Sequence, residues 1–256
     1  MVRMSSELRI HSMTTLGCAD GPGLRLVLFC QGCPLDCGYC HNPDTRSGRG
    51  GTPLTLADFA HRVQRTQAYF GPQGGVTFSG GEPLAQAAAL LPLLRWCREQ
   101  GIHTVLDTAG MVLSAAVREA VALADLVILD IKHSQPEGFR QLTGGELSRV
   151  IDFLDHCSTA GKPLWIRQVI VPTITDDPEQ VEGLGDLLCS GQRRSSIARV
   201  ELLPYHRMGL YKYQEMGMDY PLEHIPEADP QAVADLAQLL AERGLPVRSG
   251  APTAKV

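Results

Sequence analysis

The sequence predicts an α/β fold with a parallel β-sheet, and three observations predict it. Short apolar runs rich in Val, Ile and Leu alternate along the chain with longer amphipathic segments. The apolar runs mostly recur at intervals of roughly 25–40 residues, which leaves room for a helix between successive parallel strands. Hydrophobic residues make up 44% and charged residues 20% of the 256 residues, so a sizeable core is expected. About six such strand–helix units are too few for a closed eight-stranded barrel.

The expected strands are the apolar runs themselves, in chain order "LRLVLFC", "GGVTFSG", "IHTVLDT", "LVILDIK", "PLWIRQVIV" and "ARVELLPY". Several end in polar residues or glycine, as in "SGGE", "DT", "DIK" and "LPYH". In parallel α/β folds the carboxyl ends of the strands form the edge that binds ligands, so these residues are expected to share one site. The six strands are predicted at 24–30, 74–80, 102–108, 126–132, 163–171 and 198–205.

The expected helices lie between these strands. Thr55 is the expected N-cap of the first, and Gly101 takes the position after the end of the second, in which Pro92 would introduce a kink. The segment 206–229 has little apolar periodicity and is expected to be a long functional loop. The helices are predicted at 55–70, 83–101, 113–123, 146–160, 177–190 and 230–243.

Composition argues against several function classes. The net charge of −5 gives no basis for nucleic-acid binding, and no apolar run is long enough to span a membrane. The first residues, "MVRMSSELRIHSM", lack the apolar core of a secretory leader, so a cytoplasmic location is expected. No linker interrupts the chain, and residues 1–256 are expected to form a single domain, with a frayed tail "SGAPTAKV".

The densest chemical signal is "CQGCPLDCGYC", which spaces Cys33, Cys37 and Cys40 as C-x3-C-x2-C, with Cys30 three residues ahead. Cytosolic cysteines are reduced, so a tight group favours metal binding over disulfides. A zinc site with His41 as fourth ligand is the first alternative, although adjacent ligands would strain a tetrahedron. A cluster with four cysteine ligands is the second, but Cys30 ends an apolar strand and is expected to be packed. Three thiolates on a four-iron cluster is the remaining interpretation.

This spacing, with Tyr39 just before the last cysteine, resembles the signature of the radical S-adenosylmethionine superfamily. The resemblance implies that Cys33, Cys37 and Cys40 ligate a 4Fe-4S cluster whose open iron binds the amino and carboxylate groups of S-adenosylmethionine. An electron from the cluster would then cleave the S–C5′ bond to give a 5′-deoxyadenosyl radical. "SGGEPL" (79–84), for which an ordinary strand–helix turn is the alternative, resembles the superfamily motif that receives the methionine amino group.

Six blocks narrow the resemblance: "DGPGLRLVLFCQGCPLDCGYCHNPDT", "GVTFSGGEPL", "GIHTVLDTAG", "DLVILDIK", "WIRQVIVPTITDD" and "ELLPYHRMG". In this order, from about residue 10 to 248, they resemble the pyruvate formate-lyase activating family of glycyl-radical enzyme activators. The resemblance implies a partial (β/α)6 TIM-like barrel of the radical SAM type. It also implies that the radical takes a Cα hydrogen from one glycine of a partner enzyme and leaves a glycyl radical there.

The family's site residues carry over position by position. Lys132 joins the three cysteines as a catalytic residue. Asp20 in "DGPG" corresponds to a position that meets the partner's glycine loop, and simple turn chemistry is the alternative. The expected contacts of S-adenosylmethionine are Tyr39, His41, Gly80, Gly81, Glu82, Asp130, Ile131, Lys132, Arg167 and His206. The expected ligands of a monovalent cation, Na⁺ or K⁺, are Asp107, Thr108 and Asp130.

Two carboxylates on strand ends, Asp107 and Asp130, would repel unless a cation or Lys132 lies between them. A plain ion pair between Lys132 and an aspartate is the simpler alternative. His206 alone could be a surface or capping histidine, but its place after a strand in "LLPYH" favours a functional role. Ala109 in "DTAG" departs from the family, which often has Asn there, and a hydrogen bond near the cation site would be lost.

The compact form of the family is favoured, because no cysteine-rich, ferredoxin-like insert follows the cluster loop. The remaining cysteines are expected to be packing residues: Cys18, Cys30, Cys97, Cys157 and Cys189. The expected partners are pyruvate formate-lyase and a reduced flavodoxin or ferredoxin as electron donor, and the family implies a monomer. The alternatives are activation of another glycyl-radical enzyme, radical chemistry on a small molecule, or a non-catalytic iron–sulfur or zinc module.

Overall fold

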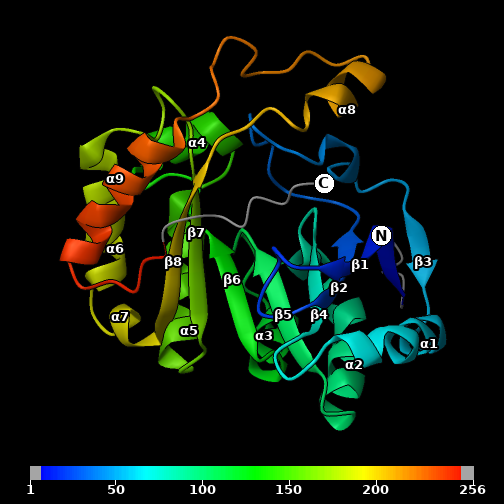
Figure 1. Ribbon diagram of the computed structural model, residues 1–256. Coiled ribbons are helices and arrows are strands. Elements are labelled where there is room, and N and C mark those ends of the chain that lie inside the picture. Colours follow the sequence, from blue (N-terminus) through cyan, green and yellow to red (C-terminus); the bar gives the residue numbers. More distant parts are fainter. Residues whose placement is uncertain (1–6, 249–256) are drawn as a thin grey trace. The chain divides into compact units, whose positions relative to one another are not determined.

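The structure is a computed structural model that describes residues 7–248 (Figure 1). Its described residues divide into two compact units. Unit 1 comprises 7–34, 45–108 and 112–128, and unit 2 comprises 35–44, 109–111 and 129–248. The tail that was predicted to be frayed and part of the "MVRMSSELRIHSM" segment lie outside the described residues. The expectation of a single domain over 1–256 stays a prediction.

Unit 1 is a sheet with helices packed on one face. Its strands are hydrogen-bonded in the order β3-β1-β2-β4-β5-β6. Strand β1 runs antiparallel to β2 and β3, whereas β2, β4 and β5 are parallel to one another. The strands are β1 (Leu8–Gly17), β2 (Arg25–Cys30), β3 (Thr52–Leu54), β4 (Gly75–Gly80), β5 (His103–Thr108) and the first residues of β6 (Leu126–Asp130).

The helices of unit 1 are held to the sheet by an apolar layer. Phe59 of α1 lies 5.9 Å from the ring of Phe78 on β4 and 5.6 Å from Trp96 of α2. Both phenylalanines are fully buried, and each such side chain contributes roughly 1.5–3 kcal/mol of burial free energy. The helical elements are α1 (Leu56–Thr66), η2 (Gln67–Tyr69), η3 (Pro83–Gln86), α2 (Ala87–Glu99) and α3 (Ala115–Leu123).

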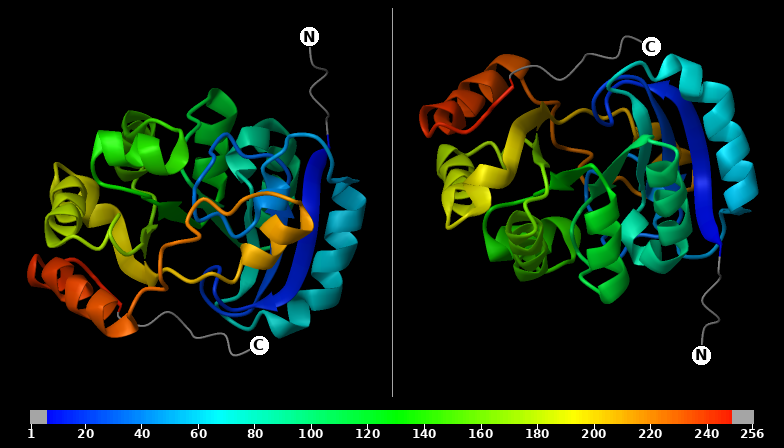
Figure 2. Two further views of the ribbon diagram at one scale, coloured as in Figure 1. Left: turned by 90° about the horizontal axis from the view of Figure 1, so that it is seen from above. Right: turned by 90° about the horizontal axis from the view of Figure 1, so that it is seen from below.

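Unit 2 continues from β6 in the order β6-β7-β8, and β7 and β8 are parallel. Helices α6 and α9 lie side by side next to β8 (Figures 1 and 2). Its further elements are α4 (Pro136–Thr143), α5 (Leu147–Thr159), β7 (Leu164–Ile170), α6 (Pro178–Cys189), α7 (Arg193–Ser196), β8 (Ile197–Pro204), α8 (Leu210–Glu215) and α9 (Pro230–Glu242). The turn η1 (Pro43–Thr45) crosses from unit 2 into unit 1.

All six predicted strands and six predicted helices are confirmed, with ends shifted by a few residues. Thr55 caps α1 by accepting a hydrogen bond from the Asp58 amide, and Gly101 has the positive φ of a residue after a helix end, +65°. Pro92 lies inside α2. The expected strand 126–132 ends earlier, at Asp130.

Several elements were not predicted. The predicted loop 206–229 contains the short helix α8, and α4 lies between β6 and α5, where no helix was predicted. The N-terminal strand β1 was also missed. Only Leu8 and Ile10 of β1 are buried, so its apolar signal is confined to its first three residues. Of the cysteines expected to pack, Cys30, Cys97 and Cys157 are buried, but Cys18 is exposed and that expectation was wrong for it.

Candidate active site

The cysteine loop is the segment after β2 that contains Cys33, Cys37 and Cys40. Its first residues are hydrogen-bonded to the turn that follows β4. The Gly81 amide donates to the Cys30 carbonyl at 2.9 Å, and the Glu82 amide donates to the Gly32 carbonyl at 2.8 Å. The Cys33 amide donates to the Arg46 carbonyl at 3.0 Å. Backbone bonds therefore fix the approach to Cys33, which is itself partly exposed. The "GCP" and "SGGE" segments, about 50 residues apart in sequence, form one corner of unit 1.

Glycine is required at both positions of the "GG" pair by the neighbouring backbone. Gly80 has φ +105°, and a Cβ there would lie 2.3 Å from the Cys30 nitrogen. A Cβ on Gly81 would lie 2.4 Å from the Gly32 carbonyl oxygen. Both distances are far below van der Waals contact, so only glycine lets these two turns touch.

Glu82 is fully buried and already has protein partners. Its Oε1 accepts from the Leu84 amide at 3.0 Å, which caps η3, and from the Thr108 hydroxyl at 2.7 Å. The neighbouring Asp107 accepts from the Ser79 hydroxyl at 2.7 Å. Ser79 was not predicted as a site residue. Asp107 and Thr108 belong to unit 1 and Asp130 to unit 2, so the cation site that would join them stays a prediction.

Cys30 faces away from this polar corner. It pairs with Gly80 in the parallel register, and Leu28 pairs with Phe78, so Cys30, Leu28 and Phe78 point to the helix-covered face of the sheet. Burial raises the pKa of the Cys30 thiol well above its usual range, and the Glu82 carboxylate raises it further. A neutral, buried thiol is a packing residue, as expected.

In unit 2, Lys132 lies among anionic and aromatic groups. Its Nζ donates to Asp130 Oδ2 at 2.5 Å and lies 5.8 Å from the centre of the Tyr39 ring. Burial alone would lower the pKa of Lys132, but Asp130, Tyr39 and Cys37 outweigh it, and the pKa rises well above its usual value. The simple Lys132–Asp130 ion pair considered from the sequence is therefore present.

Cys37 and Cys40 lie in the part of the cysteine loop that belongs to unit 2. The Cys40 amide donates to the Cys37 carbonyl at 3.1 Å, and the Gly38 amide donates to the Leu142 carbonyl at the end of α4. Burial raises the pKa of the Cys40 thiol, which the Asn42 amide and Lys132 partly offset. The chemistry of this donor set fits a bound cluster, because a buried ammonium stabilises nearby thiolates.

The two predicted histidines stack on one another. The rings of His41 and His206 lie 4.3 Å apart at 21°, and His41 Nε2 lies 3.1 Å from the His206 carbonyl oxygen. Burial, and then the proximity of His206, lowers the pKa of His41. Within residues 7–248, His206 Nδ1 and the Tyr39 hydroxyl are buried without a hydrogen-bond partner. Unsatisfied buried polar atoms are costly, so both fit a site that receives a polar ligand.

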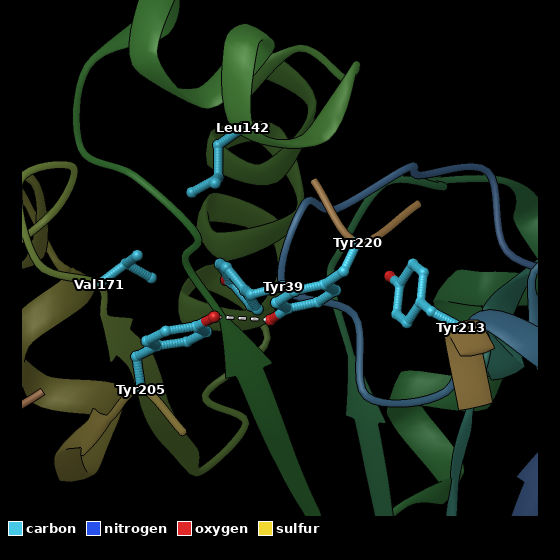
Figure 3. Close-up of a cluster of buried hydrophobic side chains, with 6 residues drawn as sticks. All are labelled: Tyr39, Leu142, Val171, Tyr205, Tyr213 and Tyr220. Atoms are coloured by element: carbon cyan, nitrogen blue, oxygen red, sulfur yellow. Dashed lines mark hydrogen bonds between the residues drawn. The ribbon is translucent and has the colours of Figure 1, made fainter. Parts of the chain in front are cut away.

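Three tyrosines from the segment after β8 form a buried cluster with Tyr39 of the cysteine loop (Figure 3). The hydroxyls of Tyr205 and Tyr220 lie 2.8 Å apart, and Tyr213 meets Tyr220 edge to face at 4.9 Å. Tyr39 belongs to the same buried cluster, together with Leu142 and Val171. The segment after β8, which looked irregular in the sequence, therefore supplies the aromatic wall of the loop that carries Cys37 and Cys40.

Arg167 was expected to face S-adenosylmethionine, and its Nε is bonded to Glu201 Oε2 on the adjacent strand at 2.7 Å. Arg199 holds the same carboxylate and stacks on Trp165, 3.5 Å from the ring centre. Ile131 is fully buried, and its amide donates to the Arg167 carbonyl. Asp20, in unit 1, accepts a hydrogen bond from the Thr77 hydroxyl through its carbonyl. The ligand and peptide contacts of these residues stay predictions.

No set of three or more His, Cys, Asp and Glu side chains in the described chain is gathered closely enough to hold a single metal ion. An iron–sulfur cluster makes a different demand, because each iron takes one thiolate instead of three or four ligands converging on one ion. No helix among residues 7–248 has the length and apolar content needed to cross a membrane.

Comparison with known proteins adds a family assignment. Residues 19–151 match the model of a 4Fe-4S single cluster domain. The chain is 43% identical to the pyruvate formate-lyase-activating enzyme of Clostridium pasteurianum, over 91% of this chain and 97% of that protein. It is 39% identical to the protein of the same name from Listeria monocytogenes, over 91% and 96%.

Solved structures support the same fold. A domain of the pyruvate-formate lyase-activating enzyme from Bacteroides vulgatus matches with a TM-score of 0.58 at 24% identity, over 69% of this chain and 99% of that one. Streptococcus suis SuiB bound to S-adenosylmethionine matches with a TM-score of 0.68 at 20% identity, over 89% and 50%. A radical SAM methyltransferase from Sphaerobacter thermophilus matches with a TM-score of 0.61 at 16% identity, over 88% and 65%. The predicted partial barrel of the radical SAM type is confirmed. From its identity to relatives over nearly their whole length, the chain belongs to the family of pyruvate formate-lyase-activating enzymes.

Proposed function

We propose that the chain activates pyruvate formate-lyase by reductive cleavage of S-adenosylmethionine at a 4Fe-4S cluster, leaving a glycyl radical on the lyase. The observation that carries this proposal is the 43% identity to an activating enzyme over 97% of its length. Because the similarity covers almost the whole of both proteins, neither has a large additional domain that could carry out a different reaction.

The cluster would be held by Cys33, Cys37 and Cys40. Cys30 is unsuited to a fourth ligand, because it points into the helix-covered core. When bound, the cluster supplies the electron that cleaves S-adenosylmethionine, and the resulting 5′-deoxyadenosyl radical takes the glycine Cα hydrogen. Lys132 keeps its proton in this environment and offsets the negative charge of the thiolates.

The S-adenosylmethionine site would draw on both ends of the cysteine loop. Gly80, Gly81 and Glu82 offer a tight backbone turn to the methionine end. The unsatisfied Tyr39 hydroxyl and His206 Nδ1 each offer a hydrogen bond to a polar ligand. The remaining contacts of this proposed site are His41, Asp130, Ile131, Lys132 and Arg167, with a monovalent cation at Asp107, Thr108 and Asp130.

Asp20 would meet the glycine-bearing segment of the lyase. A reduced flavodoxin or ferredoxin is the proposed electron donor, and the proposed form is a cytoplasmic monomer that works as one domain. The acidic net charge of −5 agrees with a protein substrate in place of nucleic acid.

Electron paramagnetic resonance tests the proposal. The reconstituted protein, S-adenosylmethionine, a strong chemical reductant and pyruvate formate-lyase are mixed without oxygen, and a glycyl-radical doublet on the lyase is expected. Cys37→Ala should abolish the doublet and the cleavage of S-adenosylmethionine while the protein stays folded. The buried, non-ligand Cys157→Ala is the matched control and should keep both. A loaded cluster that gives 5′-deoxyadenosine and methionine without the doublet would mean that another substrate is used.

A further inference from the structure

Arg25, at the start of β2, is an arginine with no solvent exposure. Its Nε donates to the Thr77 hydroxyl at 2.6 Å, its Nη1 to the Pro22 carbonyl at 2.7 Å and its Nη2 to the Val76 carbonyl at 2.8 Å. Burial lowers its pKa to about 10. Burying a guanidinium is costly unless its donors are hydrogen-bonded. The many bonds of Arg25 therefore indicate that this group has a structural role at this position.

Two of the bonds of Arg25 lead to the loop between β1 and β2, residues 18–24, which contains "DGPG": one goes directly to the Pro22 carbonyl, and one goes through Thr77. The Thr77 hydroxyl accepts the hydrogen bond from Arg25 and donates one of its own to the Asp20 carbonyl at 2.7 Å. At the other end of the loop, a Cβ on Gly23 would lie 2.5 Å from the Gly74 nitrogen. The loop is therefore fixed on both sides by bonds and by close backbone contact.

The loop lies on the face of the sheet that carries the polar site residues. Successive residues of β4 alternate between faces, and Phe78 points to α1 through its contact with Phe59. Thr77 and Ser79 therefore point to the other face, where Ser79 bonds Asp107. The loop 18–24, bonded to Thr77, covers this face one pleat below the Ser79–Asp107 pair.

The loop is also accessible from outside. Asp20 is partly exposed, and two leucines near it in sequence, Leu16 before the loop and Leu24 at its end, are 47% and 39% exposed. A partly exposed carboxylate with an exposed leucine on either side of it in sequence suits an extended peptide, whose amide hydrogens can bond the carboxylate while its small side chains contact the apolar residues.

We propose that Arg25 and Thr77 are positioning residues, which hold loop 18–24 as a preformed floor for the glycine-bearing segment of the partner enzyme. This proposal rests on the proposed function and adds two residues to it that never touch the reacting atoms. A preformed floor avoids the ordering cost of binding. Loss of the Thr77 hydroxyl should therefore raise KM for the lyase and leave kcat nearly unchanged.

Thr77→Val is the test variant and Thr77→Ser, which keeps the hydroxyl, is the rescue. Thr104→Val is the matched control, because Thr104 is an equally buried threonine of unit 1 whose hydroxyl bonds Asp125 instead of this loop. Two quantities are measured: hydrogen exchange of the loop amides in the protein without the lyase, and KM and kcat for glycyl-radical formation. Arg25→Lys is a second test variant.

For Thr77→Val we expect the hydrogen-exchange rate of the loop amides and the KM for the lyase each to rise about tenfold, as for loss of one buried hydrogen bond. Thr77→Ser should restore both, and Thr104→Val should change neither. Unchanged loop exchange in Thr77→Val would overturn the positioning role, and faster exchange with an unchanged KM would overturn the role in partner binding. A wild-type protein that forms no glycyl radical would refute the proposed function, and with it partner binding, while the exchange data still decide whether the loop is held.

Discussion

Lys212 of α8 donates to Asn42 Oδ1 at 2.9 Å and lies 3.0 Å from Asp44 Oδ2, so one ammonium fastens the end of the cysteine loop. In this clasp of Lys212, Asn42 and Asp44, the lysine comes from the segment after β8, which lacks apolar periodicity. Asn42 and Asp44 follow Cys40 by two and four residues. The clasp ties the loop of Cys37 and Cys40 to the segment after β8, which also supplies His206 and three of the clustered tyrosines.

Removing that clasp should loosen the loop without unfolding unit 2. Lys212→Met keeps the length of the side chain but removes the ammonium that bonds Asn42 and Asp44. We expect a loss of about 1–3 kcal/mol in the free energy of unfolding, because the pair is only partly exposed. Iron should also be lost to a chelator severalfold faster. Arg140→Met, which breaks an exposed pair with Glu137, should change neither, and equal iron loss in both variants would contradict the clasp.

The "GG" turn offers a sharper test of close packing. Gly80→Ala and Gly81→Ala each place a Cβ within 2.4 Å of fixed backbone atoms, so the contact between the two turns must open. We expect each to lower the free energy of unfolding by about 3 kcal/mol or more. Gly101→Ala has the same sign of φ but no atom within 4 Å, and should cost only about 1–2 kcal/mol of backbone strain. Urea unfolding of the three variants measures the difference, which vanishes if the turns are loosely packed.

His103 should make stability depend on pH. Burial, and then the Arg25 cation 3.3 Å from Nδ1, lowers the pKa of His103, while Asp125 acts in the opposite direction. The unfolded chain therefore takes up this proton first as the pH falls below about 6.5, and the free energy of unfolding decreases until the lower folded pKa is reached. Replacing His103 with Gln should reduce the loss between pH 7.5 and 5.5 by up to about 1 kcal/mol. A variant that loses as much as the wild type would show that His103 titrates normally.

The non-ligand cysteines should separate by their rates of alkylation. Cys18 is exposed, whereas Cys97 and Cys157 have no solvent exposure and burial raises the pKa of each to about 12. We expect a maleimide to label Cys18 in the native, cluster-loaded protein and to reach the other two only after unfolding. Peptide mass spectrometry identifies the labelled sites. Labelling of Cys97 at the rate of Cys18 would contradict the packing of α2 on the sheet.

The regular part of the fold was readable because its signals are local. Apolar runs such as "LVILDIK" and the N-cap Thr55 can each be recognised from a few consecutive residues. Strand β1 was missed because only Leu8 and Ile10 on it are buried, and α8 because only Tyr213 on it is fully buried. A helix of six residues has too few positions for a period to emerge.

The candidate site divides in the same way. The cysteine spacing and "SGGE" are contiguous motifs, so their residues could be named from the sequence. Arg25, Ser79 and Lys212 could not, because each acts through partners 28 to 170 residues away in the chain. The one local hint was Arg25 itself, a charged residue at the head of the apolar run "RLVLFC". Glu82 and Arg167 were named as ligand contacts, and their protein partners Thr108 and Glu201 were not foreseen.

The central claim is direct hydrogen transfer from a glycine of pyruvate formate-lyase, and an isotope label tests it most directly. The lyase is produced with glycine deuterated at Cα and incubated with the reconstituted protein, S-adenosylmethionine and a chemical reductant under anaerobic conditions. The mass of the 5′-deoxyadenosine formed is then measured. The account predicts 5′-deoxyadenosine that carries one deuterium, in an amount matching the glycyl radical on the lyase. Unlabelled 5′-deoxyadenosine formed alongside the same lyase would contradict it.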